Sequence, residues 1–317
     1  MIFPIGLESI TDFFASLIKC QKLGHAYMLL GDEGIGKKTL CNYLLTLIMC
    51  KQNTGCGICN GCATVKSGAN PDIIYVDKGD KASVSVDKIR EAISEVYIKP
   101  IISEKKVIVI KDAHLMTKGA QNALLKAIEE PPSYVVFFLL CDTKSPILDT
   151  ILSRVSVIDI PPRSIDVLKS IVPGLEEFMY RYCEGNIGKL IKLSCDDEFK
   201  SIRDNSVKIC MSVLSNDEFD TYSFDDLFVN REITLMIYDL MTVFLRDVLL
   251  DKNSCDSLII NKDKINDIKA FSRQASAKNV TKLIEIIANA GIELGKSGNI
   301  SMSRNAMFVK CREVIHD

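Results

Sequence analysis

The sequence predicts an α/β fold followed by an all-helical region. In the first half of the chain, five short apolar runs alternate with segments of helical periodicity. The runs lie at residues 26–30, 73–76, 107–110, 135–140 and 157–160. Runs that are apolar at nearly every position indicate strands buried on both faces, and strands that alternate with helices pair in parallel. We therefore expect a parallel five-stranded sheet with helices on both faces.

Between these strands, residues 37–49, 86–97 and 118–130 have the spacing of helices. The third of these helices should end at its last residue, because two prolines follow and proline cannot continue a helix. A second pair of prolines follows the fifth strand, and beyond it the strand signal fades. We expect three domains: the α/β domain at residues 1–162, a small helical domain at 163–206 and a larger helical domain at 207–317.

Composition excludes several classes of protein. The 317 residues include 39 basic and 41 acidic side chains, and 47% are hydrophobic, so the chain is globular and not disordered. A net charge of −2 argues against binding nucleic acid through bulk charge. Lys99, Lys105 and Lys106 are expected on a solvated edge, with a position near DNA as the alternative. No apolar run approaches the ~20 residues of a membrane span, and we expect a cytoplasmic protein.

A phosphate-binding loop is indicated directly after the first strand. The segment GDEGIGKK at residues 31–38 has the pattern GxxxxGK and leads into a helix. Gly31, Gly34 and Gly36 would let backbone N–H groups turn toward a phosphate, and Lys37 would reach its outer oxygens. A glycine-rich turn without a ligand is the alternative.

Two departures weaken this nucleotide site. Position 38 should carry a Ser or Thr hydroxyl for Mg²⁺ but carries Lys38, and Thr39 lies ~100° further around the helix. The third strand should end in an aspartate that positions the metal, but Lys111 stands there, followed by Asp112. We expect the Mg²⁺ site to be lost and ATPase activity to be absent from the isolated chain. ATP binding itself is left in doubt.

Four of the twelve cysteines form a cluster. Cys50, Cys56, Cys59 and Cys62 fall within thirteen residues, with glycines interleaved. Short spacings wrap the chain around one ion, and four thiolates favour structural Zn²⁺. An iron–sulfur cluster and four unliganded thiols are the alternatives. Four cysteine ligands leave no open position on the metal, so we assign this site no catalysis. The other eight cysteines are expected to pack as small apolar residues.

These motifs occur together in an order that resembles bacterial clamp-loader proteins of the AAA+ family. The residues that carry the resemblance are His25-Ala26-Tyr27, the phosphate loop, the four-cysteine insert, the run KDAHLMTKGAQNALLKAIEEPPS at 111–133 and ILSR at 151–154. The resemblance covers residues 1–190 by motif, whereas the last hundred residues agree in length and helical character. It implies an AAA+ domain with a zinc insert, a helical lid and a helical collar that oligomerises.

The resemblance also separates two branches of this family. The ATP-hydrolysing gamma/tau pattern would place Thr at position 38, Asp-Glu at 111–112 and Arg at 188. This chain has Lys38, Lys111-Asp112 and Gly188. These differences favour a subunit that does not hydrolyse ATP. The alternative is an autonomous gamma/tau-like ATPase with a divergent metal site, and a third reading is a zinc-stabilised interaction module unrelated to replication.

Ser153-Arg154-Val155 corresponds to the Ser-Arg-Cys element of the family. The resemblance implies that Arg154, with Ser153 beside it, acts as an arginine finger on ATP held by a neighbouring gamma/tau subunit. A surface or capping arginine is the alternative. The implied partners are gamma/tau and delta subunits, with the sliding clamp and primed DNA reached through the complex, and no membrane. His25 and His114 are expected to be packed or hydrogen-bonded and not catalytic.

Overall fold

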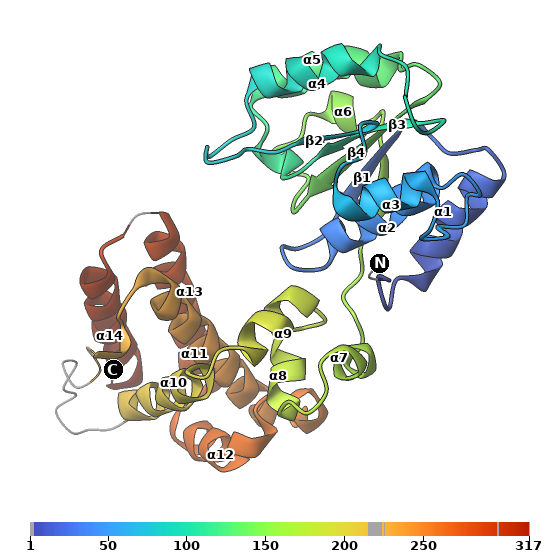
Figure 1. Ribbon diagram of the computed structural model, residues 1–317. Helices are drawn as coiled ribbons and strands as arrows, with labels where there is room; N and C mark the ends of the chain where they lie inside the picture. Colours follow the sequence, from blue (N-terminus) through green and yellow to red (C-terminus); the bar gives the residue numbers. More distant parts are fainter. Residues whose placement is uncertain (1–2, 215–223, 225, 297, 317) are drawn as a thin grey trace. The chain divides into compact units, whose positions relative to one another are not determined.

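The computed structural model describes residues 3–214, 224, 226–296 and 298–316. The chain divides into two compact units (Figure 1). The first consists of Met1–Gly174 and Cys183–Ile191, and the second of Leu175–Tyr182 and Lys192–Asp317. The segment expected to form a separate small helical domain thus contributes residues to both units. The division into three domains stays a prediction.

The first unit is built on a parallel five-stranded sheet, as the apolar runs predict. Its strands are β1 (Ala26–Leu30), β2 (Ile73–Val76), β3 (Lys106–Ile110), β4 (Val135–Cys141) and β5 (Ser156–Asp159). Their order across the sheet is β2-β3-β4-β1-β5. Leu30 pairs with Cys141 at the ends of β1 and β4. The residues that follow these two strands therefore begin side by side at the carboxyl edge of the sheet.

Helices cover both faces of this sheet, with α1 and α2 on one face and α4 and α5 on the other (Figure 1). The helices of the unit are α1 (Glu8–Lys19), α2 (Lys37–Met49), α3 (Asn60–Ser67), α4 (Val86–Val96), α5 (Lys118–Glu129), α6 (Asp149–Leu152) and α7 (Ile165–Ile171), with a 3₁₀ turn at Ala113–Leu115. Side chains of β4 alternate between the two layers. Phe138 is buried with Leu44 of α2, and Phe137 is buried with Leu124 of α5. This alternation explains why the run in β4 is apolar at every position.

A buried carboxylate fixes the loop between α4 and β3. Asp72 is fully buried and accepts hydrogen bonds from the backbone N–H groups of residues 101–103 at 2.6, 2.7 and 2.8 Å. Lys106 is also buried, and its ammonium donates to the carbonyl oxygen of Glu95 at 3.0 Å. The expectation of a solvated edge is therefore wrong for Lys106. Its apolar stem packs in the sheet while its charge reaches a helix C-terminus.

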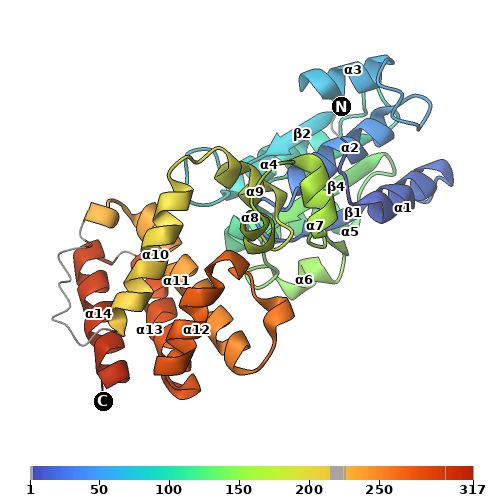
Figure 2. The ribbon, with the colours of Figure 1, turned by 90° about the horizontal axis from the view of Figure 1, so that it is seen from below.

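The second unit is helical, as predicted. Its helices are α8 (Glu177–Tyr182), α10 (Phe199–Val213), α11 (Arg231–Lys252), α12 (Ile265–Gln274), α13 (Ala277–Lys296) and α14 (Ile300–His316), with 3₁₀ turns at Asp256–Leu258 and Lys262–Lys264, and α9 (Ile187–Ser194) runs from the first unit into the second. Helix α11 is central and packs on α10, α12 and α13 (Figure 2). None of the described helices is long and apolar enough to cross a lipid bilayer.

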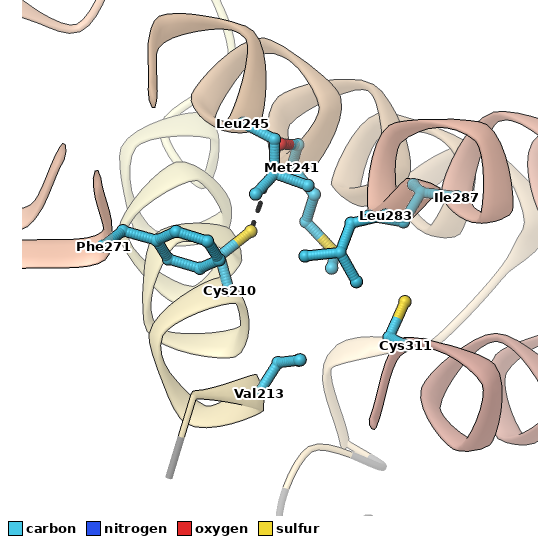
Figure 3. A pocket seen from close by; sticks show the side chains of 8 residues that line it. All are labelled: Cys210, Val213, Met241, Leu245, Phe271, Leu283, Ile287 and Cys311. Atoms are coloured by element: carbon cyan, nitrogen blue, oxygen red, sulfur yellow. Dashed lines mark hydrogen bonds between the residues drawn. The ribbon is translucent and has the colours of Figure 1, made fainter. Parts of the chain in front are cut away.

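The core of the helical unit contains a small gap. Side chains from α10 to α14 point toward it, among them Cys210, Met241, Leu283 and Cys311 (Figure 3). The cavity is about 10 Å³, at the lower limit for a single water molecule, and its lining is apolar. This gap is a packing defect and not a ligand site.

Candidate functional site

The predicted phosphate loop has the backbone shape that its sequence requires. It connects β1 to α2, and Gly36 immediately precedes the helix. Gly34 and Gly36 have φ angles of +85° and +104°, which residues with a side chain rarely adopt. Gly31, Gly34, Gly36 and Lys37 are therefore brought together at the N-terminus of α2, where a phosphate would bind.

The amine of Lys37, however, is engaged within the chain. Its nitrogen lies 2.6 Å from the carbonyl oxygen of Gly31, 2.8 Å from that of Asp32 and 2.7 Å from Oδ1 of Asp142. An ammonium group has three hydrogen atoms to donate, and these three acceptors use all of them. The Lys37 side chain is only 10% exposed. The charged partner of the Lys37 ammonium is thus an internal carboxylate.

Asp142 was not predicted as a site residue. It follows β4 directly, and it reaches Lys37 because β4 lies beside β1 in the sheet. Its backbone N–H donates to Nδ1 of His114 at 3.3 Å, and its Oδ2 lies 3.7 Å from Nε2 of the same ring. His114 is therefore a hydrogen-bonded residue, as expected. The signal that could have indicated Asp142 is a polar residue immediately after a buried strand.

The segment after residue 184 closes over the phosphate loop. The side-chain amide of Asn186 donates to the carbonyl oxygen of Glu33 at 2.7 Å, and the N–H of Gly188 donates to that of Gly34 at 2.9 Å. A Cβ atom at position 188 would lie 2.7 Å from the Cα of Gly34. Backbone atoms cannot yield as a flexible side chain can, so this contact excludes the arginine of the gamma/tau pattern.

The cation at the metal-ligand position is directed to a neighbouring strand. Lys111 follows β3, and its ammonium lies 3.8 Å from Oδ2 of Asp77 and 4.9 Å from the centre of the Tyr75 ring. Asp112 adopts a left-handed conformation with φ of +50° and begins a 3₁₀ turn. Mg²⁺ would need a hydroxyl at position 38 and a carboxylate at position 111. Both positions carry a lysine in this chain.

The four clustered cysteines meet in space. Their sulfur atoms all lie within 4.8 Å of one another, and the Cys50–Cys59 and Cys56–Cys62 pairs are each 4.0 Å apart. A tetrahedral site with metal–sulfur bonds of about 2.3 Å has edges of about 3.8 Å. The donor set and its spacing therefore fit a metal ion such as zinc.

The ends of two helices build this cluster. Cys50 directly follows the last residue of α2, and Cys59 directly precedes the first residue of α3. Gly61 permits the close approach of the helices, since a Cβ at that position would lie 1.9 Å from the carbonyl oxygen of Met49. Gly55 and Gly57 adopt left-handed conformations in the connecting loop. These glycines explain why the cysteines are interleaved with them in the sequence.

The cluster favours the ionised form of two of its sulfur atoms, those of Cys50 and Cys59. Burial of Cys50 opposes ionisation, but nearby backbone N–H groups, including that of Cys56 at 3.5 Å, lower its pKa to about 5. Hydrogen bonds from the backbone lower the pKa of Cys59 as well. Burial raises the pKa of Cys62 to about 12 in the arrangement without a cation. A bound cation would favour the ionised form of this buried fourth sulfur.

Arg154 lies near the surface, just beyond α6. Nη1 donates to the carbonyl oxygen of Thr150 at 2.9 Å and to Oγ of Ser153 at 3.0 Å, and Nη2 lies 2.8 Å from Oε1 of Glu129. The Arg154 side chain is 37% exposed. Ser153 and Arg154 thus lie together in the connection from β4 to β5, whereas the phosphate loop lies in the connection from β1 to α2.

Comparisons with known proteins decide the family. Residues 6–164, half of the chain, match the family described as DNA polymerase III, delta subunit. The chain belongs to this DNA polymerase III family. Residues 198–300 match the family described as DNA polymerase III, delta subunit, C terminal. The resemblance to clamp-loader proteins that the motifs indicated is confirmed.

The relatives of this chain include both a delta' subunit and tau/gamma subunits of DNA polymerase III. The chain is 27% identical over 297 residues to DNA polymerase III subunit delta' of Bacillus subtilis, covering 89% of each chain. It is 33% identical over 153 residues to subunit tau/gamma of Haemophilus influenzae, covering 47% of this chain but 22% of that protein. The chain therefore spans less than half the length of the tau and gamma relatives that it matches. A gamma subunit-related protein of Thermotoga maritima has a structure that aligns over 95% of this chain and 98% of its own, with 17% identity and a TM-score of 0.48.

Proposed function

We propose that this chain is the delta' subunit of a bacterial DNA polymerase III clamp loader and that it does not hydrolyse ATP by itself. Similarity to delta' along 89% of both chains supports the first part, whereas similarity to tau/gamma is confined to about half of this chain. The second part is carried by one observation, the engagement of Lys37 by Asp142 and by the carbonyls of its own loop.

The arrangement at Lys37 opposes hydrolysis for a chemical reason. Transfer of the outer phosphoryl group needs a lysine on the phosphate oxygens and a metal ion that bridges them. Here a carboxylate holds the amine, and Lys38 and Lys111 replace the groups that would hold Mg²⁺. Any nucleotide would have to displace an ion pair and would find no metal ligands. ATP binding is therefore weak at best in this proposal.

Control of hydrolysis passes instead through Arg154. In the proposed complex, Arg154 contacts the ATP of an adjacent gamma/tau subunit and stabilises charge that develops on the phosphoryl group. The position of Arg154 at the surface, with Ser153 beside it, supports this role. The complex would contain gamma/tau and delta subunits, and it would act in the cytoplasm on the sliding clamp and primed DNA. The three domains would serve as the AAA+ domain, the lid and the oligomerising collar.

The four-cysteine cluster completes the proposal as a structural zinc site. Cys50, Cys56, Cys59 and Cys62 would hold Zn²⁺ and fix α3 to the end of α2. When bound, the ion supplies cross-linking and no catalysis, since the cysteines fill all four positions. Metal analysis of protein purified without oxygen should find close to one equivalent of zinc. Less than half an equivalent, or iron in its place, would refute this assignment.

The ATPase assay on the isolated chain and on the reconstituted complex tests the function. We expect negligible turnover by the chain alone, and Arg154→Ala should lower the clamp- and DNA-stimulated turnover of the complex. Arg90→Ala is the control, because Arg90 is an exposed arginine on α4 of the same unit. Mg²⁺-dependent hydrolysis by the isolated chain that Lys37→Ala abolishes would instead establish an autonomous ATPase. Failure to assemble with gamma/tau and delta would favour the unrelated interaction module.

A further inference from the structure

Arg154 has an ionic partner in its own chain, and this partner has a consequence for the proposed finger. We infer that Glu129 is a positioning residue that holds Arg154 in reserve until a nucleotide phosphate on the neighbouring subunit competes for it. The inference rests on the proposed function. In addition, it makes the release of Arg154 from Glu129 depend on whether the neighbouring subunit holds a nucleotide.

The geometry fixes the guanidinium group on two sides. Glu129 is the last residue of α5, and its Oε1 lies 2.8 Å from Nη2 of Arg154. Helix α5 packs on the short α6, which ends two residues before the arginine. On the other side, Nη1 donates to Thr150 and Ser153. Both terminal nitrogens are thus engaged, and the arginine lies along the surface of its own subunit.

Glu129 is suited to a restraint that can be released. Its side chain is 42% exposed, and Arg154 is the ion-pair partner that the described structure gives it. An exposed pair of this kind is weak, and screening by salt weakens it further. A triphosphate carries more negative charge than one carboxylate and offers several oxygen atoms to the flat donor face of an arginine. The neighbour's ATP can therefore displace Glu129, whereas an empty neighbouring site leaves the pair intact.

The chain supplies a close control. Glu130 is the adjacent residue, it is exposed, and it also carries a carboxylate. Among the described residues, its side chain forms no ion pair or hydrogen bond with Arg154. Glu129→Gln and Glu130→Gln therefore remove the same charge one position apart, and only the first removes the restraint on the arginine.

The experiment measures ATP turnover of the reconstituted complex with and without clamp and primed DNA. Glu129→Gln should raise the unstimulated rate about two- to fivefold, the range expected from loss of an exposed ion pair. The stimulated rate should change less than twofold, because the finger is already released there. The increase should shrink at high salt, and it should vanish when Arg154→Ala is also present.

The outcomes separate the restraint from the finger. An unstimulated rate in Glu129→Gln equal to that of Glu130→Gln, or lower, overturns the role of Glu129 even if Arg154→Ala impairs the complex. A complex that Arg154→Ala leaves unimpaired refutes the finger itself, whatever Glu129 does. If Glu129→Gln fails to assemble, Glu129→Asp provides the second variant. Its side chain is one methylene shorter, so it should also lengthen the contact and raise the unstimulated rate.

Discussion

Replacement of Asp142 by alanine tests whether an internal ion pair holds the phosphate loop. The change removes the carboxylate that lies 2.7 Å from the amine of Lys37. It leaves the two carbonyl acceptors of Gly31 and Asp32 in place. The Lys37 ammonium would then have one unsatisfied hydrogen atom in a position that is mostly shielded from water.

The expected loss of stability follows from the burial of the two partners. Hydrogen bonds to charged groups contribute about 1.5–3 kcal/mol when buried, and exposed ion pairs contribute about 0.2–1 kcal/mol. Lys37 is 10% exposed and Asp142 is 32% exposed, so this pair falls between the two cases. Asp142→Ala should lower the free energy of unfolding by about 1–2 kcal/mol. Asp142→Asn should cost less, because its amide oxygen still accepts from the amine.

Urea denaturation followed by far-ultraviolet circular dichroism measures this loss, and the transition of the α/β unit is the relevant one. Asp80→Ala is the control, because Asp80 is exposed and lies at the same edge of the sheet, beyond β2. If Asp142→Ala unfolds at the same urea concentration as Asp80→Ala, the ion pair does not hold the loop. Asp142 would then not keep the amine of Lys37 from a phosphate, contrary to the proposed function.

Three further results are expected. Tripolyphosphate should raise the melting temperature of Asp142→Ala more than that of the unaltered chain, because phosphate and carboxylate compete for one amine; equal shifts in a thermal melt would contradict this. Asp72→Asn should lower the free energy of unfolding by about 2–4 kcal/mol in urea, since the amide cannot accept all three backbone hydrogen bonds; a loss below 1 kcal/mol would be incompatible with the contacts. At pH 8 a maleimide should label the exposed Cys20 and Cys195 well before Cys41, whose pKa burial raises to about 12; mass spectrometry of the labelled peptides would show a different order if these burials were wrong.

The fold could be predicted from the sequence because its strands have a recognisable apolar pattern. A strand buried on both faces must be apolar at successive positions, and β4 meets that demand along its whole length. The phosphate loop and the cysteine cluster were equally visible, since each is a local pattern of residues close in the chain. Such local patterns can be recognised in the sequence without knowing how distant segments of the chain pack against each other.

The contacts that determine what the site does are not local. Asp142 meets Lys37 because β4 lies beside β1, and the apolar runs do not specify the order of the strands. Glu129 meets Arg154 through the packing of α5 on α6. Lys106 resembled an ordinary surface lysine, and nothing in its neighbours along the chain shows that its stem is buried. Each of these residues acquires its role from a partner more than ten positions away.

The contact between Gly188 and the phosphate loop would make the proposed loss of ATP hydrolysis hard to reverse. Exchange of Lys38 and Lys111 for the residues of the hydrolysing pattern would restore two functional groups without moving the backbone. Position 188 is different, because any side chain there meets the backbone of Gly34 at 2.7 Å. A return to hydrolysis would require the segment to lift from the loop before an arginine became useful. Under the proposed function, this packing would therefore keep an arginine away from the loop even after Lys38 and Lys111 were exchanged.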